Sequence, residues 1–264
     1  MKTAVLFFGE IRGMPEHWQK VYDMVVKPNN ADVFMALTTY NPSFLDSYSS
    51  EQRILLENYY KNKGVNYYPS RELLDIFKPI VLKCDPKYSY PLEHYDKFVN
   101  NVNHIYSLAV DNNFNYDCTK LAYYAIMNQN DRRANAIKLK YEYEKKTGIQ
   151  YDNVILTRLD INPMSTIEFP TRLSRMCVRG SSYFINEQLI AGPSDTMNVF
   201  LHLLEDMPKI YEDHCNMQHH FMQNEYHICI FLRKHGILTQ SIDIPLGYHI
   251  EHSNGLLRFD FSFK

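Results

Sequence analysis

The stretch "LTRLDIN" ends a run of apolar residues with a charged pair. Arg158 and Asp160 follow the apolar run 153–157, and Asn162 adds an amide oxygen two residues further on. A carboxylate at the end of a buried strand can bind a divalent cation, which in turn neutralises a diphosphate. We therefore expect Asp160 and Asn162 to bind a divalent cation, with Arg158 as an additional positive group. An Arg158–Asp160 ion pair that only closes the edge of a sheet is the structural alternative.

A second charged stretch, "FFGEIRG", follows the apolar run 3–8. Gly9 and Gly13 allow the backbone to approach a ligand closely, and Arg12 has the forked donors that suit a phosphate. The stretch has neither the GxGxxG spacing of a dinucleotide fold nor the GK[ST] of a P-loop. It predicts that Gly9, Glu10 and Arg12 bind a ligand that carries a phosphate. A polar surface loop is the alternative.

The elements that position these residues follow from apolar periodicity. Strands are expected at 3–8, 32–38, 80–83, 153–157, 183–191 and 257–263, and helices from Pro15 to Pro28 and at 50–62, 119–146, 194–205 and 224–236. Residues 84–117 are expected to be irregular. Residues 3–38 form a β-α-β unit, whose right-handed crossover implies a parallel sheet. In such open sheets ligands bind beyond the carboxyl ends of the strands, where both charged stretches fall.

The composition indicates an intracellular protein without a nucleic-acid partner. The 264 residues carry a formal net charge of -2, which gives no long-range attraction to nucleic acid. The five cysteines form no CxxC pair, which is typical of free thiols in a reducing compartment. The apolar run 4–8 is too short for a signal-peptide core or a membrane span. We therefore expect a cytoplasmic location, in the host cytoplasm if the protein is viral.

Three stretches together resemble the GT-A glycosyltransferases: the strand–Gly–x–x–Arg opening, "ADVF" at 31–34 and "YDNVILTRLD" at 151–160. The likeness is greatest to the small nucleotide-sugar enzymes of large algal DNA viruses (chlorovirus type). It implies one α/β domain with a mixed, mostly parallel sheet flanked by helices. Residues 1–162 would bind the nucleotide-sugar donor, with UDP as the expected nucleotide, and 163–264 a glycan or glycoprotein acceptor. The D-x-D motif of that family, which binds Mn²⁺ or Mg²⁺, reads R-x-D here.

The resemblance also implies roles for residues outside the two stretches. Arg132 would contact the nucleobase or phosphates, and Gly192 would leave room for the donor sugar. Glu225, in the first turn of a helix, would be the base that activates the acceptor hydroxyl of an inverting enzyme, with Asp195 as the rival base. Favourable interaction with the helix dipole is the structural explanation for Glu225. His249 would be a further metal ligand.

Two alternative functions remain open from the sequence. A non-catalytic nucleotide-sugar-binding module on the same scaffold would explain the arginine in place of the first D-x-D aspartate. A metal-dependent hydrolase would use His214, His219 and His220, although their spacing matches no zinc motif.

Overall fold

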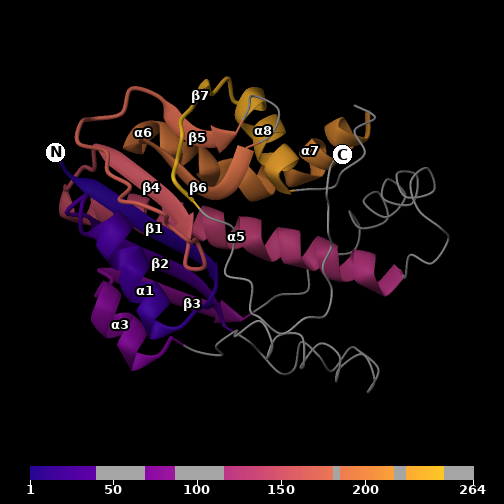
Figure 1. Ribbon diagram of the computed structural model, residues 1–264. Coiled ribbons are helices and arrows are strands. Elements are labelled where there is room, and N and C mark those ends of the chain that lie inside the picture. Colours follow the sequence, from indigo (N-terminus) through magenta and orange to yellow (C-terminus); the bar gives the residue numbers. More distant parts are fainter. Residues whose placement is uncertain (40–68, 87–115, 181–184, 217–223, 247–264) are drawn as a thin grey trace, which may run out of the picture.

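Seven strands form one mixed sheet in the computed structural model, which describes residues 1–39, 69–86, 116–180, 185–216 and 224–246 (Figure 1). Their order across the sheet is β3-β2-β1-β4-β6-β5-β7. The strands are β1 (Thr3–Glu10), β2 (Asp32–Thr39), β3 (Val81–Pro86), β4 (Asn153–Arg158), β5 (Met176–Gly180), β6 (Ile185–Pro193) and β7 (Thr239–Ser241). Among these described strands only β6 runs antiparallel to its neighbours. The predicted α/β class with a mostly parallel sheet is confirmed.

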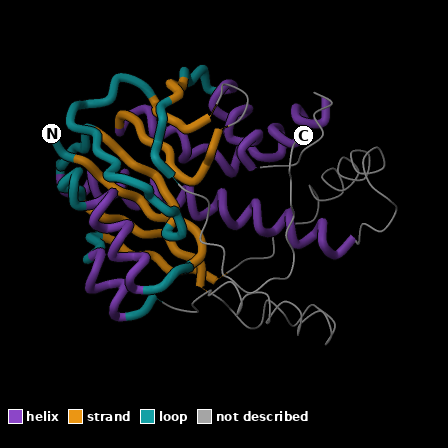
Figure 2. The backbone as a smooth tube through the Cα atoms, in the orientation of Figure 1, coloured by secondary structure: helices purple, strands orange, loops and turns teal. Residues whose placement is uncertain are grey.

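Helices cover both faces of this sheet, as the tube in Figure 2 shows. On one face lie α1 (Pro15–Val21), its π-helical continuation η1 (Tyr22–Val26) and α3 (Arg71–Phe77). On the other face lie α5 (Tyr116–Thr147), α6 (Ser194–Met197), the 3-10 helix η4 (Asn198–His202), α7 (Leu203–Asn216) and α8 (Asn224–Lys234). Among the residues that the structure describes, no helix is both long and apolar enough to cross a membrane.

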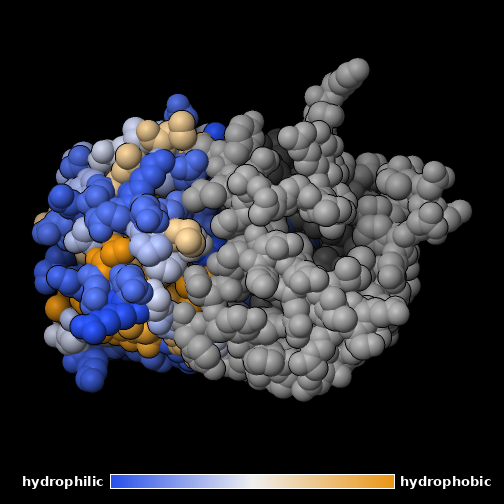
Figure 3. Space-filling model, turned by 60° about the horizontal axis from the view of Figure 1, so that its bottom comes forward, coloured by the Kyte–Doolittle hydropathy of each residue, from blue (hydrophilic) through white to orange (hydrophobic). Residues whose placement is uncertain are grey.

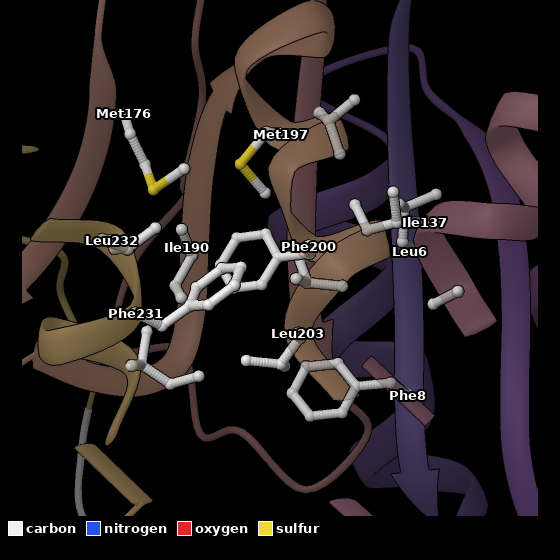
Figure 4. Packing of buried hydrophobic residues seen from close by; sticks show 14 of the residues in the cluster. Leu6, Phe8, Ile137, Met176, Ile190, Met197, Phe200, Leu203, Phe231 and Leu232 are labelled. Atoms are coloured by element: carbon white, nitrogen blue, oxygen red, sulfur yellow. The ribbon is translucent and has the colours of Figure 1, made fainter. Parts of the chain in front are cut away.

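The apolar run in β1 exists because both of its faces are buried. Leu6 and Phe8 pack into a core with α5, η4, α7 and α8, whereas Phe7 packs into a second core with α1, η1 and α3. Figure 4 shows part of the first core, where Phe200 and Phe231 lie beside Ile190. The described surface in Figure 3 is mostly hydrophilic, with small hydrophobic areas. The period-2 alternation of strand side chains therefore fills two cores from one continuous apolar run.

Most of the predicted elements that can be compared with the structure are present. The strands at 3–8, 32–38, 80–83 and 153–157 and the helices at 119–146 and 224–236 are confirmed. The prediction of a single helix at 194–205 is wrong. The chain passes from α6 through the 3-10 helix η4 into α7, and α7 continues to Asn216 with Pro208 inside it. The sequence did not predict α3, β5 or β7. The helix at 50–62, most of the irregular segment 84–117 and the strand at 257–263 lie outside the described residues.

The strand order places a topological switch point between β1 and β4. From β1 the chain moves outward to β2 and β3, and β4 then pairs in parallel on the other side of β1. The connections after β1 and β4 therefore diverge at the carboxyl edge, which is where open α/β sheets bind ligands. Both charged stretches of the sequence follow these two strands.

Candidate functional site

A cavity of about 170 Å³ lies at the carboxyl ends of β1, β2 and β4. It is lined by Gly9, Glu10, Arg12, Thr38, Asn128, Gln129, Arg158 and Asp160. The two charged stretches thus meet at one site, as the sequence predicted. The contributions of β2 and α5, from Thr38, Asn128 and Gln129, were not predicted, because no sequence signal shows which turn of α5 lies against the sheet edge.

The loop after β1 is shaped by two glycines and anchored to α1. Gly9 and Gly13 both have φ of 98°, a conformation that other residues rarely adopt. A Cβ on Gly13 would lie 2.9 Å from a ring carbon of His17, so this position also needs a glycine for close packing. The indole Nε1 of Trp18 donates to the Arg12 carbonyl at 2.7 Å. Of the two glycines, only Gly9 lines the cavity, and the turn directs the Arg12 side chain into it.

Asp160 lies between two arginines. The Arg158 guanidinium donates from Nε to Oδ1 at 2.8 Å and from Nη2 to Oδ2 at 2.6 Å, which is a forked pair. Arg12 Nη1 donates to Oδ2 at 3.2 Å, and Arg12 also pairs with Glu10. The Arg12 and Arg158 side chains remain 25% and 20% exposed, so this ion cluster reaches the cavity. The pair expected as the structural alternative is present, and it is also part of the cavity wall.

Glu187 is a buried carboxylate that the sequence motifs did not single out. It accepts from Arg133 and Asn224 through Oε2 and from Gln129 through Oε1. Arg158 Nη1 lies 3.8 Å from Oε1, so Glu187 joins the cavity wall to the first residue of α8. The signal was present in "INEQL", where an acid occupies the buried register of β6 between Ile185 and Leu189. A carboxylate in that register requires a buried cationic partner.

Glu225 lies next to this network, in the first turn of α8. Its neighbour Asn224 bonds Glu187 and accepts a hydrogen bond from Asn130 of α5 at 3.0 Å. Burial, together with the negative charge of Glu187, raises the pKa of Glu225 to about 7 from 4.5, against the opposing influence of Arg133 and Arg158. A carboxyl group with this pKa can accept a proton near neutral pH, which is what a general base requires.

The described residues do not fit the expected divalent cation. Both oxygens of Asp160 accept from guanidinium groups, and Asn162 Oδ1 accepts from Lys20 Nζ on α1 at 2.8 Å. Asn162 does not line the cavity either. His249 lies outside the described residues, and within them no group of three His, Cys, Asp or Glu side chains could hold a metal ion. The expected metal set is therefore not brought together in this part of the chain.

Two residues expected at the site lie at the opposite edge of the sheet. Because β6 is antiparallel to β4, Gly192 pairs with Val154 near the amino end of β4. A Cβ on Gly192 would meet the Met197 side chain at 3.2 Å, so this glycine serves core packing and leaves no room for a sugar. Asp195 follows β6 at that same edge, is exposed, and accepts from the Thr196 backbone N–H at 2.8 Å. Neither residue lies near Asp160.

Arg132 does not line the cavity itself, although it lies one turn beyond Asn128 and Gln129 and bonds Thr38 of the cavity wall. Its side chain is buried in the middle of α5, where it donates to Asp85 Oδ2 at 2.7 Å and to Thr38 Oγ1 at 3.2 Å. It therefore ties α5 to β2 and β3 and does not line the cavity. The alternative zinc site cannot be compared, because the side chains of His214, His219 and His220 lie outside the described residues.

Comparisons with known proteins give little beyond this geometry. No protein-family model matches the chain, and no curated protein is similar to it in sequence. Among solved structures, mouse xyloside xylosyltransferase 1 in its apo form is similar, with 10% identity and a TM-score of 0.33. The similarity covers 92% of this chain and 85% of that one. A likeness this distant carries no argument about function. The fold and the cavity define an α/β protein with an arginine-lined site at a topological switch point.

Proposed function

We propose that this protein is a glycosyltransferase that moves a sugar from a nucleoside-diphosphate sugar to a hydroxyl group of a glycan or glycoprotein. The observation that carries the proposal is the cavity at the switch point between β1 and β4, with Arg12 and Arg158 in its wall. Nucleotides bind at this position in open α/β sheets. Every residue that lines the cavity belongs to the half 1–162, which was expected to bind the donor.

The two arginines suit the diphosphate of the donor. Guanidinium groups match phosphate oxygens with paired donors and keep their charge at every accessible pH. The diphosphate leaves with the electrons of the glycosidic bond, so its negative charge grows in the transition state. Arg12 and Arg158, already fixed by Glu10 and Asp160, stabilise that charge without having to reorganise.

Glu225 is the proposed base. The acceptor hydroxyl loses its proton as it attacks the anomeric carbon, and a carboxylate with a pKa of about 7 is ionised in a useful fraction of molecules at neutral pH. Glu225 follows Asn224, which donates to Glu187, and Glu187 lies 3.8 Å from Arg158 of the cavity wall; the proposal therefore puts the acceptor on the α8 side. With Glu225 as the base, the proposed reaction inverts the configuration at the anomeric carbon. Asp195 is not proposed for this role, because it lies at the opposite edge of the sheet.

A donor screen tests this function. The protein is incubated with UDP- and GDP-sugars, and donor hydrolysis is followed as release of the nucleoside diphosphate. We expect slow hydrolysis of at least one donor and faster consumption once a suitable acceptor is added. Glu225→Gln should retain donor binding and lose transfer, whereas Glu205→Gln, at an exposed acid of α7, should retain both. Normal transfer by the Glu225→Gln variant would contradict the assigned base.

A binding module without catalysis is the second candidate. Its specific support is that Asp160 accepts hydrogen bonds from Arg12 and Arg158, at the position where a metal ion was expected. The same screen separates the two candidates. Thermal stabilisation by a UDP-sugar without any turnover, with and without acceptor, would favour the binding module.

A further inference from the structure

We propose that the arginine pair of Arg12 and Arg158 binds the diphosphate directly, in place of a divalent cation, and that Asp160 is a positioning residue for this pair. This inference rests on the proposed function and concerns how the same site neutralises its ligand. It departs from the metal ligation that the sequence suggested for Asp160.

Positive and negative side chains alternate at the site, and each arginine donates to at least one carboxylate. Glu10 bonds Arg12, Arg12 and Arg158 both bond Asp160, and Arg158 lies 3.8 Å from Glu187. Arg158 therefore uses its Nε and Nη2 edge on Asp160, while its Nη1 lies beyond hydrogen-bonding distance of Glu187. A guanidinium has five N–H donors, so Arg158, which uses only Nε and Nη2 on Asp160, still has donors for phosphate oxygens.

A divalent cation at Asp160 would meet strong opposition. It would have to displace guanidinium nitrogens that lie 2.6 to 3.2 Å from the carboxylate oxygens, or share those oxygens next to two fixed positive charges. Like charges a few ångströms apart repel strongly in a partly buried site. The amide oxygen expected as a second ligand, Asn162 Oδ1, is taken by Lys20. The two guanidinium groups carry the same formal charge of two as the cation, and they already pair with the carboxylates of Glu10 and Asp160.

The first measurement is calorimetric titration of the whole protein with UDP and GDP, in a chelator and again with Mn²⁺. We expect the affinity for the preferred nucleotide to agree within about threefold between the two conditions, since ordinary screening effects of added ions are of that order. In parallel, the electron paramagnetic resonance signal of free Mn²⁺ should fall no further with protein and nucleotide together than with nucleotide alone.

Variants at Arg158 separate direct binding by the arginine from a structural effect. Arg158→Ala should weaken nucleotide affinity in chelator about a hundredfold, and Arg158→Lys, which keeps the charge but loses the forked donors, about tenfold. Asp160→Asn should weaken affinity about tenfold without creating or removing any response to Mn²⁺, because the arginines lose their charged anchor. Arg172→Ala, at an exposed arginine of the loop before β5, is the control and should bind as the parent protein does.

The outcomes of these titrations distinguish a failure of the arginine assignment from a failure of the glycosyltransferase proposal. Binding that is at least tenfold tighter with Mn²⁺, together with capture of free Mn²⁺, would overturn the arginine assignment and leave the glycosyltransferase proposal standing. Absence of binding to either nucleotide under both conditions would overturn both. Binding that is equal in chelator and Mn²⁺ but unaffected by Arg158→Ala would also overturn this inference.

Discussion

The two edges of the sheet each hold a cluster of ionic groups, and the clusters differ in what surrounds them. At the amino edge, Lys140 Nζ contacts Glu144 Oε2 at 3.0 Å, Ser194 Oγ at 2.6 Å and Asn198 Oδ1 at 2.7 Å, and the lysine side chain is 0% exposed. At the carboxyl edge, the Arg12–Asp160–Arg158 cluster is 14 to 25% exposed and forms a cavity wall.

This difference separates a structural ion cluster from one that can bind a ligand. The Lys140 cluster makes its bonds inside the protein, where it joins α5 to Ser194 of α6 and Asn198 of η4. The carboxyl-edge arginines are also bonded to carboxylates, but their side chains remain 20 to 25% exposed at the cavity. Charge and burial alone would favour the amino edge as the ligand-binding site. The cavity and the strand order instead favour the carboxyl edge.

The largest expected effect is on stability, at the amino edge. Lys140→Met leaves Glu144 as a buried carboxylate without its cation and should lower the free energy of unfolding by about 3 to 5 kcal/mol, measured by urea denaturation. Lys138→Met, two residues away and exposed, is the control and should cost about 0.5 kcal/mol or less. The comparison of the two edges fails if folded Lys140→Met protein has lost nucleotide affinity more than tenfold.

Glu187→Gln should give the next largest effect, at the carboxyl edge. Buried Arg133 loses its charged partner, so we expect the free energy of unfolding to fall by about 2 kcal/mol. Removing the negative charge also lowers the pKa of Glu225, because Glu187 is one of the causes that raise it. The rising limb of the pH–rate profile for transfer should therefore move to lower pH. A profile that stays in place would show that Glu187 does not act on the base.

Glu225→Gln should change stability in a pH-dependent way. The folded-state pKa of about 7 lies above the ordinary 4.5, so the protonated acid favours folding. This contribution is fully present below pH 4.5 and is lost as the pH rises through 7. Because glutamine stays neutral, the melting temperature of the variant relative to the parent should be higher at about pH 8 than at about pH 5. Equal differences at both pH values would contradict the raised pKa.

The smallest effect is expected for Asp195→Ala. The side chain is exposed and bonds its own helix end, so the cost to stability should be about 0.5 to 1 kcal/mol with transfer unchanged. Loss of transfer in a stable Asp195→Ala protein would place the active site at the amino edge and contradict the assignment of the ligand site to the carboxyl edge. Thermal melts and the donor assay measure both quantities.

The sequence predicted the features that depend on local pattern. Continuous apolar runs identified β1, β2 and β4, and the rule that ligands bind at the carboxyl edge correctly grouped Glu10, Arg12, Arg158 and Asp160. What the sequence missed depends on strand direction and pairing. The antiparallel course of β6 carries Gly192 and Asp195 away from the site and brings Glu187 to it, and no local pattern reports that direction.

The same limit applies to the partners of each charge. The sequence suggested that Asp160 and Asn162 face one metal ion, since they are two residues apart. In the structure Asp160 turns to the arginines and Asn162 to Lys20. Arg12 and Lys20 lie 148 and 142 residues before their partners Asp160 and Asn162, so no local pattern shows these contacts.

Titration of the protein with UDP and GDP, compared with the Arg158→Ala and Arg172→Ala variants, tests the central claim most directly. If the carboxyl-edge cluster is the nucleotide site, the parent protein and Arg172→Ala bind one of the two nucleotides equally well. Arg158→Ala then loses about a hundredfold in affinity while remaining folded. Equal binding by all three proteins, or binding by none, would contradict the account.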